Sequence, residues 1–237
     1  MTEDHRDTSE RLLAAAADLF ARHGYDGTSI RDIATAADVN VAAINYHFQG
    51  KENLYHEVLR RVVEGKRDRY MEGMRAVREE QPGDARAIIR SFFKMHFEDT
   101  LKTPEGGQFL ALFVRELHHG QPHTAQIISD SLIPLWEDLG ESLLATMPEI
   151  TPEIAPWIAG SLHGQMVHFT MRWHKAHCCT TGCRESANPV ARIFPLPIED
   201  VDEYIDTAVE HITHFSVAGI RGCIEANRAL KTEGDHS

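Results

Sequence analysis

The chain has 237 residues, 42% of them hydrophobic, and a formal net charge of −12 at pH 7. That length suits one large domain or a small head with a larger body, and the apolar content is enough for a packed core. No run approaches the ~20 apolar residues that a membrane span needs, and the polar, acidic N-terminal segment does not resemble a secretory signal. We therefore expect a cytoplasmic protein with reduced cysteines and no membrane partner.

Apolar residues recur at helical spacing along the chain, whereas the alternation typical of strands is scarce, so the predicted fold class is all-α. The first helix starts near Thr8 or Ser9 and ends at Gly24, with a buried stripe that includes Leu12, Ala16 and Phe20. A fourth helix opens at Gly50 and Lys51 after two short ones. The remaining helices are expected at about 84–101, 106–119, 123–146, 151–176 and 199–229, with a long irregular stretch at 179–198.

Residues 28–48 contain two short helices separated by three or four residues. Thr28 caps the first of these helices, which turns Ile33 and Ala34 inward, and Asn40 caps the second, which runs from about Val41 to Phe48. Two short helices joined by a brief turn are typical of a helix-turn-helix, in which the second helix enters the major groove of DNA.

The second short helix has the side chains that such a position requires. Val41, Ala42 and Ala43 keep its start slim and offer methyl groups to thymine, and Asn45 can form a bidentate pair with adenine. Tyr46 and His47 can donate to phosphates, and Lys51 adds a cation beside a helix N-terminus. A packed helix in a larger bundle is the alternative that periodicity alone leaves open.

Residues 9–55 resemble the DNA-binding head of the TetR family of transcriptional regulators. The resemblance is carried by a series of segments that match in order, namely HGY at 23–25, TSIRDIA at 28–34, DVN at 38–40, YHF at 46–48 and KENL at 51–54. It implies a three-helix head at residues 1–55 and a helical body at 56–237 that binds an effector and forms the dimer. The body resembles the CecR-like subgroup through VRELHHGQPH at 114–123 and SLHGQMVHF at 161–169.

By that resemblance, particular residues fall where the family contacts DNA. The base-reading set is Arg31, Val41, Ala42, Ala43 and Asn45, and the phosphate-holding set is Thr28, Tyr46, His47 and Lys51. The operator sequence cannot be carried over, because the family often has a lysine or another polar residue in place of Val41 and a tyrosine in place of Asn45.

The resemblance also implies how the protein acts. We expect a homodimer joined through the last two long helices, 151–176 and 199–229, and an apolar stripe with Ile205, Val209, Ile212 and residues 215–220 supports this. The two heads must then lie about 34–36 Å apart to use successive major grooves of double-stranded operator DNA. An effector that favours another spacing releases the repressor from its palindrome.

The effector is expected to be a small apolar or aromatic molecule, because aromatic residues and methionines recur in the predicted body helices. The candidate pocket residues are Phe93, His96, Phe113, Trp136, Met166 and Phe169.

One cluster of histidines and cysteines suggests a metal. His174, His177 and Cys178 share one face at a helix end, and Cys183 follows in the long loop, so together they could hold zinc. The spacing matches no common zinc site, and surface thiols with solvated histidines, or a redox thiol pair, are the alternatives. No cofactor is required for the regulator itself; a metal- or thiol-sensing regulator of the same fold is the alternative function.

An enzyme and a partner-binding protein are the two other classes of protein that a helical chain of this kind could represent. An enzyme is not expected, because no glycine-rich phosphate loop, nucleophile elbow or HExxH segment occurs in the sequence. A helical partner-binding protein without DNA recognition is the third class, and Val41 and Asn45 leave it conceivable.

Overall fold

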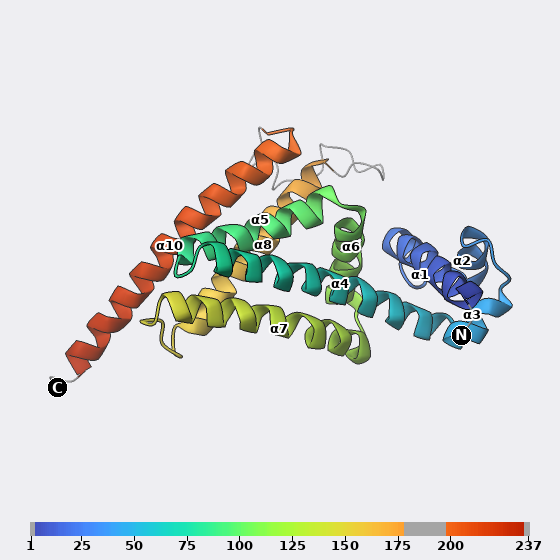
Figure 1. Ribbon diagram of the computed structural model, residues 1–237, viewed down its shortest axis with the longest axis horizontal. Coiled ribbons are helices and arrows are strands. Elements are labelled where there is room, and N and C mark those ends of the chain that lie inside the picture. The colour runs from blue at the N-terminus through green and yellow to red at the C-terminus, as the bar shows by residue number, and fades with distance from the viewer. Residues whose placement is uncertain (1–2, 178–197, 235–237) are drawn as a thin grey trace. The chain divides into compact units, whose positions relative to one another are not determined.

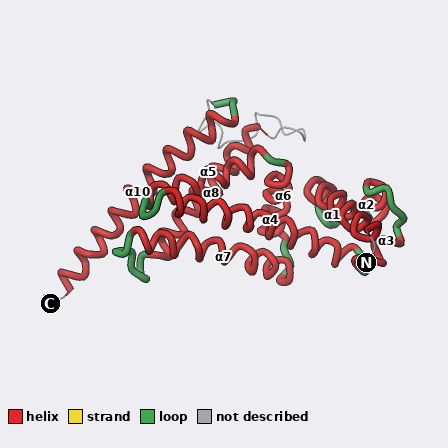
Figure 2. Tube along the Cα trace, viewed as in Figure 1, coloured by secondary structure: helices red, strands yellow, loops and turns green. Residues whose placement is uncertain are grey.

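The computed structural model describes residues 3–177 and 198–234, and within these ranges the regular secondary structure is α-helical throughout (Figures 1 and 2), which confirms the predicted all-α class. The N-terminal helices are α1 (Glu3–His23), α2 (Ile30–Ala36), α3 (Ala42–Phe48) and α4 (Lys51–Glu80). They are followed by α5 (Ala85–Lys102), α6 (Pro104–His119), α7 (Pro122–Thr146), α8 (Ala155–His177) and α10 (Val201–Gly234).

The chain folds as two compact units. Unit 1 comprises residues 1–69 and 103–135, and unit 2 comprises residues 70–102 and 136–237. The helices α4 and α7 each contribute their first part to unit 1 and their last part to unit 2. The predicted domain boundary at residue 55 falls inside α4, within unit 1.

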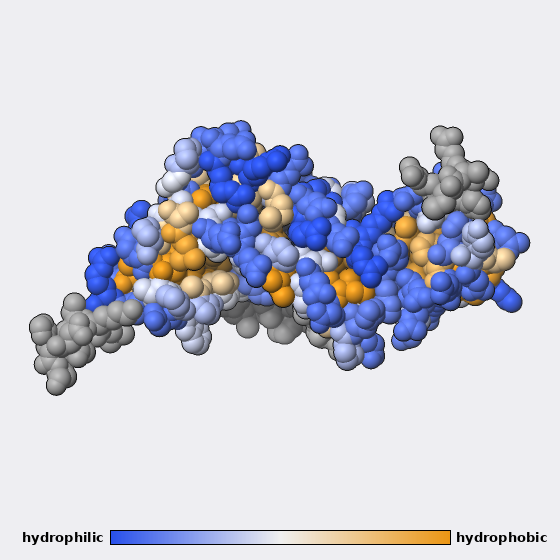
Figure 3. Space-filling view, turned by 60° about the horizontal axis from the view of Figure 1, so that its bottom comes forward, coloured by the Kyte–Doolittle hydropathy of each residue, from blue (hydrophilic) through white to orange (hydrophobic). Residues whose placement is uncertain are grey.

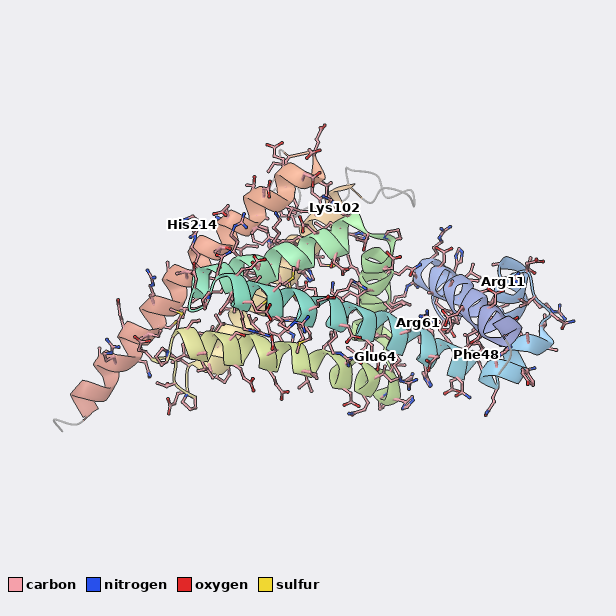
Figure 4. The ribbon with its side chains drawn as sticks, viewed as in Figure 1. Arg11, Phe48, Arg61, Glu64, Lys102 and His214 are labelled. Atoms are coloured by element: carbon pink, nitrogen blue, oxygen red, sulfur yellow. The ribbon has the colours of Figure 1, made fainter. Side chains whose placement is uncertain are left out.

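Unit 1 is organised around one apolar core. Helix α1 contributes Leu12, Ala16 and Phe20, which are fully buried, and packs against α2, α3 and α6. Burial of these side chains is what holds the short helices α2 and α3, since an isolated helix of seven residues is not stable in water. At the surface of the unit, Arg61 of α4 forms an ion pair with Glu10 of α1 (Figure 4).

Unit 2 is a bundle in which α10 lies along α5 and α8. Arg86 and Arg90 of α5 both bind the Glu210 carboxylate of α10, at 2.9 and 2.7 Å, and these bonds lower the pKa of Glu210. Lys102, at the end of α5, pairs with Asp202 at 2.5 Å (Figure 4). These partly exposed ion pairs link α5 to α10 at both ends of their contact.

The apolar stripe of α10 faces its own bundle. Ile205, Val209, Ile212 and Ile220 are buried within the protomer, and Phe215 is exposed. These four buried side chains pack inside the protomer, where α10 contacts α5 and α8, so they do not support the predicted dimer contact, which stays a prediction. A dimer through α10 must use the opposite face of the helix.

The surface is largely hydrophilic on the face drawn in Figure 3, with apolar patches between the polar stretches. Across residues 3–177 and 198–234, none of the helices combines the length and the apolar character that crossing a bilayer requires.

Candidate nucleic-acid interface

Helix α2 begins with a capping box. The Ser29 hydroxyl accepts a hydrogen bond from the Asp32 backbone N–H at 3.2 Å, and the Ser29 N–H donates to the Asp32 carboxylate at 3.1 Å. Hydrogen bonds from the Ser29 side chain and backbone lower the pKa of Asp32. The reciprocal bonds satisfy two backbone donors and fix where the helix-turn-helix starts.

Thr28, predicted as the cap and as a phosphate contact, has a different role. Its side chain is 2% exposed, and its hydroxyl donates to the Gly24 carbonyl at 2.8 Å and the Leu19 carbonyl at 3.2 Å. The cap is Ser29, one residue later, and the Thr28 hydroxyl is turned away from solvent and hence from any phosphate. Thr28 instead ties the end of α1 to the start of α2.

The turn between α2 and α3 is fixed from outside by α1. Asp38 adopts a left-handed conformation with φ of 52°, and its carbonyl accepts a 2.9 Å hydrogen bond from Arg11 (Figure 4). Arg11 also pairs with the Asp38 carboxylate at 3.4 Å. The Asn40 side chain accepts from the Ala42 N–H at 2.8 Å and so starts α3. These contacts hold the turn and the start of α3 in place within the head.

Helix α3 has one buried and one exposed face. Ile44 is fully buried, and Phe48 is half-buried against the same core. Ala42 and Asn45 are exposed, and Tyr46 is exposed over 72% of its surface. An exposed aromatic ring and amide on a short helix held rigidly by its neighbours are what a groove-reading helix presents.

The other predicted base-reading residues lie around this face. Arg31 of α2 is exposed, whereas Val41 and Ala43 are half-buried and pack partly against the core. The structure thus brings Ala42, Asn45 and Tyr46 together on one surface, with the methyl groups of Val41 and Ala43 at its edge.

The predicted phosphate-holding residues Tyr46, His47 and Lys51 follow one another at the end of α3 and the start of α4. The rings of Tyr46 and His47 are in edge contact, with centroids 5.1 Å apart. Between the helices, Gln49 has φ of 63° and Gly50 has φ of 133°, so that α4 starts abruptly at Lys51. The Lys51 ammonium lies 4.2 Å from the centre of the Tyr25 ring.

The predicted effector residues do not form one cluster. Phe93 and His96 are buried in unit 2, where the His96 Nε2 lies 2.8 Å from the Thr170 hydroxyl, while Phe113 belongs to unit 1. A small apolar cavity of about 60 Å³, partly open to solvent, lies between α7 and α8 in unit 2. Its lining residues are Trp136, Leu139, Gly140, Leu143, Leu144, Ile150, Ala155, Ile158, Ala159 and Leu162. Of the predicted pocket residues, Trp136 alone is in that lining.

The predicted metal cluster lies mostly outside the described residues. His174 is exposed on α8, and His177 is the last residue of that helix, but Cys178 and Cys183 fall between the two described ranges. Within the ranges that the structure describes, no three His, Cys, Asp or Glu side chains are grouped so that they could hold a metal ion.

Sequence reasoning missed Ser29 and Tyr25. The signal for Ser29 was present, since Ser29 and Asp32 have the spacing of a capping box. Nothing in the sequence places Tyr25 beside Lys51, because 26 residues separate them and the contact depends on how α1 packs against α4.

A capped α2, a fixed turn and an α3 with an exposed polar face define a helix-turn-helix, and the protein is a DNA-binding transcriptional regulator of that class. Residues 12–58 match the family described as "Bacterial regulatory proteins, tetR family". The matched residues span the helix-turn-helix and the start of α4, so the head is similar to the DNA-binding head of TetR-family regulators.

Relatives and solved structures agree with this assignment. The HTH-type transcriptional regulator RutR of Escherichia coli (strain K12) is 29% identical over 214 residues, which cover 89% of each chain. The negative transcriptional regulator IcaR of the icaADBC biofilm operon of Staphylococcus aureus (strain Newman) is 35% identical over 48 residues, 20% of this chain and 26% of IcaR. The fatty acid degradation regulator FadR from Bacillus halodurans shares the fold, with a TM-score of 0.62 at 15% identity over 87% of this chain and 94% of that one.

Proposed function

We propose that the protein is a cytoplasmic repressor that binds a palindromic operator as a homodimer and leaves it when a small molecule binds the body. The observation that carries the DNA-binding part is the exposed face of α3 with Asn45 and Tyr46. IcaR, with which the head shares 35% identity, is named a negative regulator, and this supports repression. The proposed subgroup is CecR-like, on the segments at 114–123 and 161–169.

Two sets of residues divide the DNA contacts. Arg31, Ala42 and Asn45 are proposed to read base edges, with the methyl groups of Val41 and Ala43 beside them. Tyr46, His47 and Lys51 are proposed to hold phosphates. The first set changes which sequence is preferred, whereas the second changes affinity for all DNA and its dependence on salt.

The proposed dimer forms through the exposed faces of α8 and α10. Trp157 is 78% exposed and Phe215 is 64% exposed. Small residues accompany them, and a Cβ added at Gly160, Gly164 or Gly219 would meet no neighbour within 4 Å in the described protein. Large exposed aromatic side chains beside small residues allow two helices to approach closely and bury the rings at a subunit contact.

The proposed effector is apolar or aromatic and binds within unit 2. The small cavity between α7 and α8 is lined by apolar residues, which suits a hydrocarbon or aromatic group. The buried pair of His96 and Thr170 offers polar atoms elsewhere in the same unit. Effector and operator then favour different states, and each weakens the binding of the other by the same factor.

Selection of bound sequences from a random DNA library tests this function. Wild type is expected to enrich a palindrome with half-sites about one helical turn apart. Asn45→Ala is expected to relax the preference at one base pair per half-site and keep the palindrome. Enrichment of no sequence by a folded dimer would contradict the proposed regulator and favour the partner-binding alternative.

Zinc sensing through His174, His177, Cys178 and Cys183 remains a separate hypothesis. It is tested by the zinc content of tag-free protein prepared under reducing conditions. About one zinc per chain, lost in the double variant His174→Ala/Cys183→Ala, would support a metal site.

A further inference from the structure

We propose that Tyr25, Tyr55 and Glu116 position Lys51 for its phosphate contact, so that α6 determines how firmly the head holds DNA. All four residues lie in unit 1, on the α1–α2 connection, α4 and α6. The inference rests on the proposed contact between Lys51 and phosphate, and goes beyond it by assigning residues that are not themselves proposed to touch DNA.

Lys51 is held over an aromatic ring. Its Nζ lies 4.2 Å from the centre of the Tyr25 ring, and its side chain is half-buried. A lysine side chain in free solution samples many rotamers, and a phosphate contact requires one of them. The attraction of the ammonium to the ring face keeps the charge near one place before DNA arrives.

Tyr25 is in turn held by two rings. Its centroid is 5.2 Å from that of Tyr55 and 6.2 Å from that of Phe20, and the Phe20 and Tyr55 rings meet edge to face at 4.9 Å. Phe20 is fully buried and Tyr55 is 6% exposed. The platform beneath Lys51 therefore rests on the core of the unit.

Tyr55 is tied to α6 by a hydrogen bond. Its hydroxyl donates to Glu116 Oε1 at 2.5 Å. Burial first, and then this carboxylate, raise the pKa of Tyr55, so the phenol stays protonated and remains a donor at every physiological pH. The other carboxylate oxygen, Glu116 Oε2, is buried and has no hydrogen-bond partner among the atoms that the structure describes.

The neighbouring residue of α6 holds the end of α1. Arg115 donates to the Ala21 carbonyl at 3.3 Å and the Arg22 carbonyl at 3.0 Å, where a cation also suits the helix dipole. Gly24 has φ of +75°, and a Cβ there would lie 2.5 Å from Arg115 Nη1. Two adjacent residues of α6 thus contact the segments on either side of Tyr25. Arg115 binds the end of α1, and Glu116 binds Tyr55 near the start of α4.

A purely structural role of these contacts would affect stability alone. Positioning of Lys51 additionally affects the number of phosphates that the head neutralises, which is measured by the slope of the logarithm of affinity against the logarithm of salt concentration. Each lost contact makes that slope shallower by about 0.9, or about 1.8 for two heads, and weakens binding about fivefold per head at 0.15 M salt.

The experiment measures operator affinity of the full-length protein between 0.05 and 0.3 M salt, roughly the range in which this dependence is strongest. The variants are Lys51→Gln, Tyr25→Leu and, as the matched control that keeps the ring, Tyr25→Phe. We expect Lys51→Gln and Tyr25→Leu to give the same shallower slope, the double variant to lose nothing more, and Tyr25→Phe to match wild type.

The link to α6 is tested by Tyr55→Phe and Glu116→Gln. Glutamine keeps an oxygen that accepts the tyrosine hydrogen bond, so Glu116→Gln is expected to retain the wild-type slope, and Tyr55→Phe to shift it toward that of Lys51→Gln. Thermal melts of each variant separate a change in slope from a change in folding. If Tyr25→Leu does not fold, the comparison of Tyr55→Phe with Glu116→Gln decides.

The possible results separate the positioning of Lys51 from its proposed phosphate contact. An unchanged slope in Lys51→Gln overturns the proposed phosphate contact and the inference together. A shallower slope in Lys51→Gln, with wild-type slopes in folded Tyr25→Leu and Tyr55→Phe, overturns the positioning role and leaves the phosphate contact standing.

Discussion

Alanine substitutions at two adjacent residues of α3 should have different effects, one on folding stability and the other on base discrimination. Ile44 is fully buried in the head core, whereas Asn45 is exposed on the other face of the same helix. Ile44→Ala removes three buried carbon atoms, worth about 2.4 kcal/mol at ~0.8 kcal/mol each, and leaves a cavity. Because such substitutions cost about 2–5 kcal/mol in all, we expect a loss near 3 kcal/mol in the free energy of unfolding.

Urea unfolding followed by circular dichroism measures this loss, and Asn45→Ala is the matched control. The control is expected to change the free energy of unfolding by less than about 0.5 kcal/mol, because Asn45 is exposed. It should instead reduce discrimination at one base pair by about 1–3 kcal/mol in competition binding, since a bidentate contact is lost.

The reverse pattern would refute the reasoning. An Ile44→Ala protein as stable as wild type, but with altered base preference, would mean that Ile44 faces the groove. A loss of more than about 1 kcal/mol of stability in Asn45→Ala would mean that its side chain supports the head.

Three further outcomes are expected. Thr28→Val should lower the free energy of unfolding by about 1 kcal/mol in urea titrations and leave the salt dependence of DNA binding unchanged, because the Thr28 hydroxyl donates inward. Burial and the neighbouring His123 lower the pKa of His56, so below pH ~6.5 the unfolded chain binds more protons and the melting temperature should fall from pH 7 to pH 5, less steeply in His123→Gln. Trp157→Gln should weaken the dimer by ~2 kcal/mol in sedimentation velocity and make the melting temperature fall more on dilution than in wild type, and an unchanged dimer would exclude that face.

Much of the fold was predictable because helical periodicity and chain breaks are local. The helices predicted at 84–101 and 123–146 are observed at Ala85–Lys102 and Pro122–Thr146. The inward side chains of the head, such as Ile33 and Ala34, were predicted by the same spacing. Errors at the ends came from competing caps, as with Ser29, whose backbone geometry rather than residue type decides which neighbour starts α2.

The candidate site was only partly predictable. Exposure of Asn45 follows from its place on α3 about 100° around the helix from the buried Ile44, which a helical wheel shows. Burial of Thr28 and the contact of Lys51 with Tyr25 depend on packing between distant segments, which no local pattern encodes. The stripe on α10 was identified correctly as apolar, but the sequence did not say whether its partner was this chain or a second copy.

The carboxylate of Glu116 also identifies a position at which substitutions can raise the stability of this protein. One of its oxygens is buried without a hydrogen-bond partner among the described residues, and such a group lowers stability. Replacing both members of a buried polar pair by apolar groups of similar shape can be neutral or stabilising. A screen for heat-resistant variants should therefore recover combined substitutions at Tyr55 and Glu116 readily. By the proposed positioning role, such variants would be more stable but would hold Lys51 less firmly for its phosphate contact, a common cost of stabilising a functional position.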